Sequence, residues 1–332
     1  MKGKRILGVI GMLCLVGGLL FSAGGSEAQT ATKAINWPTK PIQLIVPYNP
    51  GGDTDIFGRV VAQAVQEVLG KPVVVVNVAG AGGTVASRQV RDADPDGYSI
   101  LWMQPNLLLN KITGIADFSF EAFDGIATSI STKTTVLVTS GNSRFMNLND
   151  LKKELVAKPG TVKFATQVGG YTHLTALALE NAAGSKFKKL DVGGNTDQVA
   201  ALLGGHVDVM TMEYGIGKDY IESGRVRVLA NLANTRSSVI PDVPTAKEQG
   251  LDLGVGFEKV FFTLFPKGTP SEIVEIFNNA VNTGIQSEKA KSDLMKFYAT
   301  PDYRNAEDSY AFLESQMNYY MSMQDLLKND TF

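Results

Sequence analysis

The stretch Ile42-Gln43-Leu44-Ile45-Val46-Pro47-Tyr48-Asn49-Pro50-Gly51-Gly52-Asp53-Thr54-Asp55 decides the fold. An apolar run, a glycine turn and a helical pattern follow one another, which predicts a strand over 42–46 and a helix that begins near Asp53. The first N–H groups of such a helix have no intrahelical partner, and the helix dipole adds partial positive charge. We therefore expect an anion site here, and our hypothesis is that it holds the carboxylate of a small solute.

The same plan of strand, glycine-rich loop and helix recurs along the chain. Similar loops cover Asn77–Thr84, Gln167–His173 and Gly193–Asp197, each after an apolar run that predicts a strand. In open α/β sheets, ligands bind beyond the carboxyl ends of the strands. We expect these loops and the one at 47–55 to face one another across a cleft.

Two such α/β segments are joined by long apolar runs near 126–138 and 257–265. The pattern predicts an α/β protein with two lobes, each a mostly parallel sheet flanked by helices, connected by a two-strand hinge. In the stretch 103–125 the apolar residues show no clear helical or strand periodicity. The expected boundaries are lobe 1 at 29–130 plus 259–305, lobe 2 at 131–258, and a C-terminal helix at 306–332 that packs across the lobes.

Residues 1–28 predict a cleaved secretory signal peptide. A basic start precedes the apolar run Ile6–Phe21, which is shorter than the roughly 20 residues of a membrane span. Ser26-Glu27-Ala28 fits a cleavage site after Ala28, with Ala23 as a second choice. The alternative is an uncleaved membrane anchor. We expect a periplasmic or otherwise extracytoplasmic protein.

Composition and motifs argue against several classes of function. With 31 basic and 33 acidic residues there is no basic excess for nucleic acid. The single cysteine, Cys14, lies in the signal segment, so no disulfide or thiol nucleophile is expected in the mature chain. The sequence contains neither Gly-x-Ser-x-Gly nor a phosphate P-loop, and Val85 interrupts a dinucleotide fingerprint at Gly80-x-Gly82. We expect no catalytic residues, metal or cofactor.

The sequence does not decide the roles of three polar residues near the loops. Asp55 fits a helix start, where it would bind backbone N–H groups, but it also lies in the opening loop. Glu213 ends a predicted strand, where it would meet a ligand ammonium or pair with a lysine or arginine. His173 would contact either ligand or nearby backbone.

The motifs at 47–55, Asn77–Gly83 and Pro95–Tyr98 resemble those of the solute receptors of tripartite tricarboxylate transporters, the Bug family. The likeness continues, in family order, through Gly169–Leu174, Gly204–Asp208, Ser223–Arg227, Pro241–Thr245 and Pro266–Pro270. It implies a type II periplasmic-binding-protein fold whose lobes close on a small carboxylate without catalysis. It also implies membrane permease subunits as partners.

In that family, first-lobe loops hold one carboxylate and second-lobe residues set specificity. Together with the candidates from the loop pattern, the expected ligand-binding residues are Tyr48, Asn49, Gly52, Asp53, Thr54, Ala81, Gly83 and Thr84 in lobe 1, and Thr166, Gln167, Gly170, Tyr171, Thr172, Asn195, Thr196, Asp197 and Glu213 in lobe 2. The chain departs from the family pattern at Val76, at Ala79, over Gly170–Thr172 and over Leu190–Gly194. The solute is therefore left open among mono-, di- and tricarboxylates and acidic amino acids.

We expect a monomeric receptor that delivers this solute to a transporter of the tripartite tricarboxylate type. Two alternatives stay open. One is a receptor of similar fold that serves another transporter or a sensor kinase. The other is an exported α/β enzyme that uses an unmarked pair of carboxylates.

Overall fold

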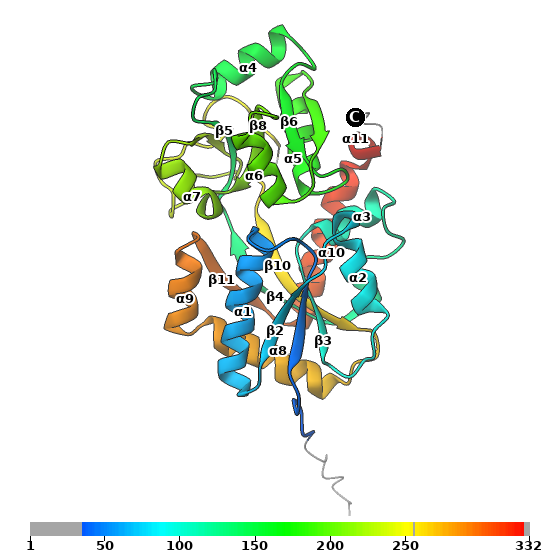
Figure 1. The fold of residues 1–332 in the computed structure, drawn as a ribbon. Helices are drawn as coiled ribbons and strands as arrows, with labels where there is room; N and C mark the ends of the chain where they lie inside the picture. Colours follow the sequence, from blue (N-terminus) through cyan, green and yellow to red (C-terminus); the bar gives the residue numbers. More distant parts are fainter. Residues whose placement is uncertain (1–34, 255, 329–332) are drawn as a thin grey trace, which may run out of the picture. The chain divides into compact units, whose positions relative to one another are not determined.

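The computed structural model describes residues 35–254 and 256–328 (Figure 1). The predicted signal peptide at 1–28 lies outside the described residues. The chain forms two sheets, with strand orders β11-β4-β10-β3-β1-β2 and β7-β6-β8-β5-β9. They are the lower and the upper sheet in Figure 1.

The first sheet has a parallel half and an antiparallel half. Strands β1, β2 and β3 are parallel, β10 runs antiparallel to both β3 and β4, and β11 runs antiparallel to β4. All but β10 and β11 therefore point the same way, as a sheet built from strand–helix–strand units requires. The bounds are β1 Ile42–Val46, β2 Val73–Asn77, β3 Ser99–Met103, β4 Phe123–Thr132, β10 Lys259–Pro266 and β11 Ala299–Arg304.

In the second sheet, too, most strands point the same way. Strand β6 is parallel to β7 and β8, and β5 runs antiparallel to β8 and β9, so β5 alone is reversed within this described sheet. The bounds are β5 Thr135–Ser140, β6 Lys163–Thr166, β7 Lys188–Asp191, β8 Val209–Glu213 and β9 Val226–Asn231. The expected α/β fold with two sheets is confirmed, and both sheets are mixed because each contains at least one strand that runs against the common direction.

Helices cover both faces of the first sheet, where α1 packs against α8 and α10 packs against β4 and α3. The helices near the first sheet are α1 Asp53–Leu69, α2 Thr84–Arg91, α3 Asn106–Ile112, α8 Ser271–Ile285, α9 Glu288–Met295 and α10 Ala306–Ser322; those near the second are α4 Leu148–Ala157, α5 Tyr171–Ala183, α6 Asn195–Leu203, α7 Tyr214–Glu222 and α11 Gln324–Lys328.

Successive residues of the central strands enter different cores. Leu44 belongs to the cluster that contains residues of α1 and α8, whereas Ile45 belongs to the cluster that contains residues of α2 and α3. Side chains alternate between the faces of a strand, so a strand covered by helices on both faces is apolar throughout. This explains the unbroken apolar run over 42–46.

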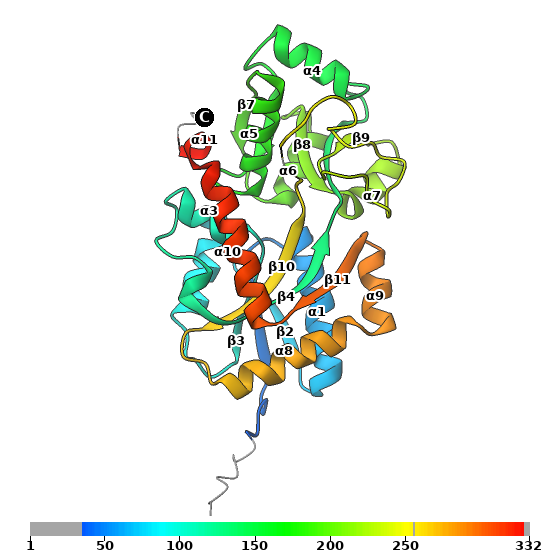
Figure 2. The same ribbon diagram turned by 180° about the vertical axis from the view of Figure 1, so that it is seen from behind.

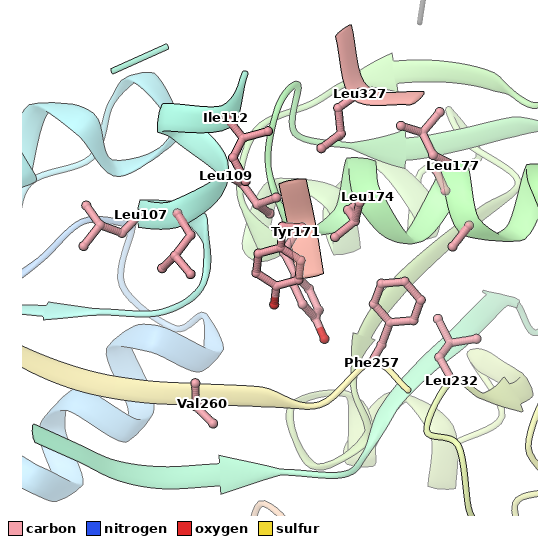
Figure 3. Packing of buried hydrophobic residues seen from close by; sticks show 14 of the residues in the cluster. Leu107, Leu109, Ile112, Tyr171, Leu174, Leu177, Leu232, Phe257, Val260 and Leu327 are labelled. Carbon is pink, nitrogen blue, oxygen red and sulfur yellow. The ribbon is translucent and has the colours of Figure 1, made fainter. Parts of the chain in front are cut away.

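One hydrophobic cluster extends from the first sheet to the second. Figure 3 shows Leu109 of α3 and Leu174 of α5 on either side of Tyr171, with Val260 of β10 and Leu327 of α11 in the same cluster. Figure 2 shows α10 lying along the first sheet and leading into α11, which contacts α5. The two sheets therefore share buried apolar surface on this side of the molecule.

Some predicted elements were wrong in detail. The run 126–138 is two strands, because β4 pairs in the first sheet and β5 in the second, with the change at Lys133 and Thr134. The stretch 103–125 contains α3, whose residues are all buried apart from Lys111, so it shows no amphipathic period. Helix α7 and strand β11 were not predicted, and Met323 separates α10 from α11.

The expected lobe boundaries remain a proposal.

Within the described ranges, no helix has both the length and the apolar character that a membrane crossing requires.

Candidate functional site

The glycine-rich loops of the two sheets meet around a small inner pocket with a volume of about 40 Å³. An outer cavity of about 370 Å³ adjoins it and shares Tyr48, Asn49, Gln167, Gly194 and Asp197 with its lining. The inner pocket is lined by Tyr48, Asn49, Gly52, Asp53, Thr54, Gln104, Asn106, Gln167, Tyr171, Thr172, Gly194, Asn195, Thr196, Asp197, Gln198 and Lys259.

The structure brings together most of the expected site residues. Those that line the inner pocket are Tyr48, Asn49, Gly52, Asp53, Thr54, Gln167, Tyr171, Thr172, Asn195, Thr196 and Asp197, while Ala81 lines only the outer cavity. Gly83, Thr84, Thr166, Gly170 and Glu213 line neither space. That the lining residues bind a ligand stays a prediction.

Three helices begin at the pocket. The N-cap residues of α1, α5 and α6 are Gly52, Gly170 and Gly194, and a glycine has no side chain that could cap its own helix. The first-turn N–H groups of a helix need acceptors from outside it. In contrast, side chains cap three helices that start away from the pocket, α4, α9 and α10, through Asn147, Ser287 and Asn305.

The α6 start has the most unpaired donors. At α1, Thr54 N donates to Asp53 Oδ1 at 2.6 Å, and at α5, Tyr171 N donates to Asn106 Oδ1 at 2.7 Å. Within the described chain, the N–H groups of 195–197 donate to no acceptor. An anion at this end of the pocket would meet several backbone donors and the positive end of the helix dipole.

Asn106 connects the loops of the two sheets. Its Oδ1 accepts from Tyr171 N, while its Nδ2 donates to Tyr48 Oη at 2.7 Å and to Gln167 Oε1 at 2.9 Å. The backbone donor fixes the orientation of this amide. Sequence reasoning missed Asn106 and Gln104 because they lie in the stretch without period. The signal was present, since both polar residues lie within three residues of the carboxyl end of β3.

The Tyr48 hydroxyl is used within the protein. It accepts from Asn106 and from Gln104 Nε2 at 3.0 Å, and it donates to Gly82 O at 3.3 Å. Burial raises the pKa of Tyr48 well above its ordinary value, so the phenol stays protonated. Gly83 and Thr84 support this loop from behind, and Asn110 Nδ2 donates to the Thr84 hydroxyl at 3.1 Å.

A buried lysine pairs with carboxylates from both sheets. Lys259 Nζ, at the start of β10, lies 2.7 Å from Asp53 Oδ2 and 3.9 Å from Glu213 Oε1. The side chains of Thr134 and Thr135 donate to Glu213 at 3.1 and 2.7 Å. Glu213 therefore pairs with a lysine inside the protein, and Lys259 is a pocket residue that the sequence reasoning missed.

One cation faces two carboxylates in this triad, so the triad has no uncompensated positive charge. Burial raises the pKa of Glu213, although the Lys259 charge opposes this rise. For Lys259, burial acts to lower the pKa, but the two carboxylates outweigh it and raise the value. Lys259 is the only cation among the described pocket-lining residues and is already paired. A bound anion would depend mainly on N–H donors.

Asp55 and His173 both bond to backbone beside the pocket. Asp55 Oδ2 accepts from Gly51 N at 3.0 Å, and Arg59 and Asn77 donate to the same carboxylate. Burial acts to raise the pKa of Asp55, but these bonds and the Arg59 charge lower it overall. His173 Nδ1 accepts from Gly169 N at 3.1 Å.

The sequence model of the tripartite tricarboxylate transporter family receptor matches residues 57–326. The chain belongs to this receptor family. BugT of Bordetella pertussis is 30% identical over 321 residues, which cover 96% of this chain and 95% of BugT. The expected family is therefore confirmed.

Solved structures agree with the family assignment. The periplasmic binding protein BugD is 26% identical and matches with a TM-score of 0.82 over 88% of this chain and 98% of BugD. MatC from Rhodopseudomonas palustris, with bound malate, is 23% identical and matches with a TM-score of 0.77 over 88% of this chain and 100% of MatC. The first match supports a Bug-type receptor, and the second supports the shared fold.

We predict that Lys259→Met lowers the free energy of unfolding by about 3–5 kcal/mol, because two buried carboxylates lose their cation. Without the ammonium, the pKa of Glu213 rises further, so the loss should shrink as the pH is lowered and this carboxyl becomes protonated. Denaturant unfolding at several pH values measures both effects.

The matched control is Lys267→Met, just after the same strand. Lys267 pairs with Asp124 at 3.3 Å but is 66% exposed, and exposed pairs contribute little. If both variants lose the same stability at every pH, the proposed role of the buried triad is wrong.

We further predict that Asp55→Asn lowers the free energy of unfolding by about 1–2 kcal/mol near pH 7. The folded pKa of Asp55 lies below its ordinary value of 3.8, so its stabilisation is present above that value and is lost as the pH falls through the folded pKa. The difference from wild type should vanish in acid. Asp92→Asn is the control, since it removes an exposed ion pair with Arg91, and its stability should equal that of wild type.

Proposed function

We propose that this protein is an extracytoplasmic receptor that captures a small organic carboxylate in the inner pocket. The candidate ligands are mono-, di- and tricarboxylates and acidic amino acids. The receptor then delivers its ligand to the permease subunits of a tripartite tricarboxylate-type transporter. Family membership supports the receptor role, and the pocket supports the class of ligand.

The observation that carries the ligand class is the meeting of three helix starts at one pocket. Gly52, Gly170 and Gly194 are their N-caps, and these glycines have no side chains to cap the helices; at α6 the first N–H groups also have no other described acceptor. A carboxylate oxygen accepts several hydrogen bonds at once and is stabilised by the helix dipoles. An additional cation would not be required for this recognition.

The placement of the pocket supports capture by closure around the ligand. Its wall combines Asn49, Gly52 and Thr54 from the first sheet's loops with Asn195 and Thr196 from the second sheet's loops. Thr196 Oγ1 donates to Pro50 O at 3.5 Å, a long bond between these loops. A ligand that bonds to both sets of loops would stabilise their contact, and the closed form would be the form read by the transporter.

An enzymatic role has less support. Asp53, the most deeply placed carboxylate of the pocket wall, is paired with Lys259. No group of histidine, cysteine, aspartate and glutamate residues in the described chain is arranged to hold a metal ion. We propose a monomeric receptor without catalysis, exported by the signal peptide predicted at 1–28.

A thermal-shift and calorimetry panel tests the proposed ligand class. Saturable stabilisation by at least one small carboxylate is expected, because a ligand that binds only the folded state raises its stability by mass action. The ligand should be recovered unchanged after long incubation. Stabilisation only by amines or sugars would overturn the carboxylate assignment, and chemical conversion of the ligand would support an enzyme.

Gly52→Leu tests whether the pocket is the binding site. A Cβ at Gly52 would lie 3.7 Å from Thr196 Oγ1 and 3.9 Å from Asn195 Cβ, so a larger side chain projects into the pocket. The φ of Gly52 is −82°, which any residue adopts, so the backbone is not strained. Affinity should fall at least about 100-fold, equivalent to about 2.7 kcal/mol, with little change in melting temperature.

Thr283→Leu adds a comparable apolar group on the exposed side of α8 and should leave affinity unchanged. Wild-type affinity in Gly52→Leu would place the binding site elsewhere.

A further inference from the structure

Gln198 presents an unused acceptor at the pocket. It lies in the first turns of α6, it is 1% exposed, and it lines the inner pocket. Its Oε1 is buried and accepts no hydrogen bond from any residue in 35–254 or 256–328. A buried acceptor without a donor is costly, so such atoms at a pocket indicate what a ligand supplies.

The orientation of the Gln198 amide is fixed by its neighbours. Nε2 donates to Gly193 O at 2.9 Å and to Thr172 Oγ1 at 3.3 Å. The Gly193 carbonyl can only accept, so the nitrogen must occupy this position. The other amide atom, Gln198 Oε1, is therefore an acceptor, and it requires an N–H or O–H donor.

The amide that carries this acceptor bonds, through Nε2, just before the helix start whose donors are expected to hold a carboxylate. The Gln198 side chain turns back to Gly193, just before the N-cap of α6, where the N–H groups of 195–197 are unpaired. A ligand carboxylate on those groups would bring its adjacent carbon close to Gln198 Oε1. The donor and acceptor positions thus match a carboxylate together with a hydrogen-bond donor on the neighbouring carbon.

We propose that Gln198 selects carboxylates that carry a hydroxyl or ammonium group on the carbon next to the carboxylate. The inference rests on the proposed function, since it names a subclass of the same ligands. Gln198 Oε1 accepts from this substituent, and an unsubstituted acid leaves the acceptor unpaired. Sites that bond a ligand donor discriminate strongly against the analogue that lacks it.

The test compares acids matched in carbon skeleton. For each chain length, one acid lacks the donor and the others carry it: propionate against lactate and alanine, succinate against malate and aspartate, and tricarballylate against citrate. Calorimetry with wild-type protein should give a preference of at least about tenfold, or 1.4 kcal/mol, for the substituted acid of the length that binds. Comparison of the hydroxy and amino acids identifies which donor is used.

Gln198→Leu removes the acceptor while keeping similar volume. Its affinity for the substituted acid should fall to that for the unsubstituted acid, whose own affinity should stay near the wild-type value. General damage to the site would instead lower all affinities in parallel and keep the ratio. Gln63→Leu, on the exposed side of α1, is the matched control and should keep the wild-type ratio.

Three results separate the hypotheses. Equal wild-type affinity for matched acids overturns the role of Gln198 and leaves the carboxylate receptor intact. A preference that persists in Gln198→Leu also overturns it, because another group then reads the donor. If no acid of any length binds, the proposed function itself fails.

Discussion

The burial of the Lys259 ammonium is the constraint on which the site depends. A charge with so little exposure requires compensating charge and hydrogen bonds nearby. Asp53 supplies one carboxylate from the start of α1, and Glu213 supplies another from the end of β8. One cation therefore ties a helix start of the first sheet to a strand end of the second, at the place where the chain passes between the sheets.

A second consequence concerns which polar groups remain for a ligand. Tyr48, Asn106 and Gln104 bond to one another and to nearby backbone, so their polar atoms mainly hold the loops in place. The first N–H groups of α6, Asn195 Nδ2 and Gln198 Oε1 are not used in this way. A pocket lined by many amides and hydroxyls thus keeps a smaller set of unpaired groups, which includes both donors and an acceptor.

Family membership and the contacts within the structure explain different features of the protein. Family membership accounts for the two-sheet architecture and for the glycine-rich loops at the carboxyl ends of the strands. The pocket proposed to hold the ligand is lined by side chains from the loops of both sheets. Gln198 lies in α6, four residues after the segment 190–194, and lines the inner pocket.

The sequence by itself determined the glycine-rich loops and the strands and helices around them, and it predicted an anion site at 47–55. These features depend on local periodicity, turn chemistry and helix starts, which neighbouring residues specify. Only the tertiary structure decided that Glu213 pairs with Lys259, that Asn106 joins the two sets of loops, and that Gln198 keeps an unpaired oxygen. Lys259 and Asp53 are far apart in the chain. The charge that each residue neutralises and the bonds that each side chain completes therefore depend on packing between sheets, which no local pattern records.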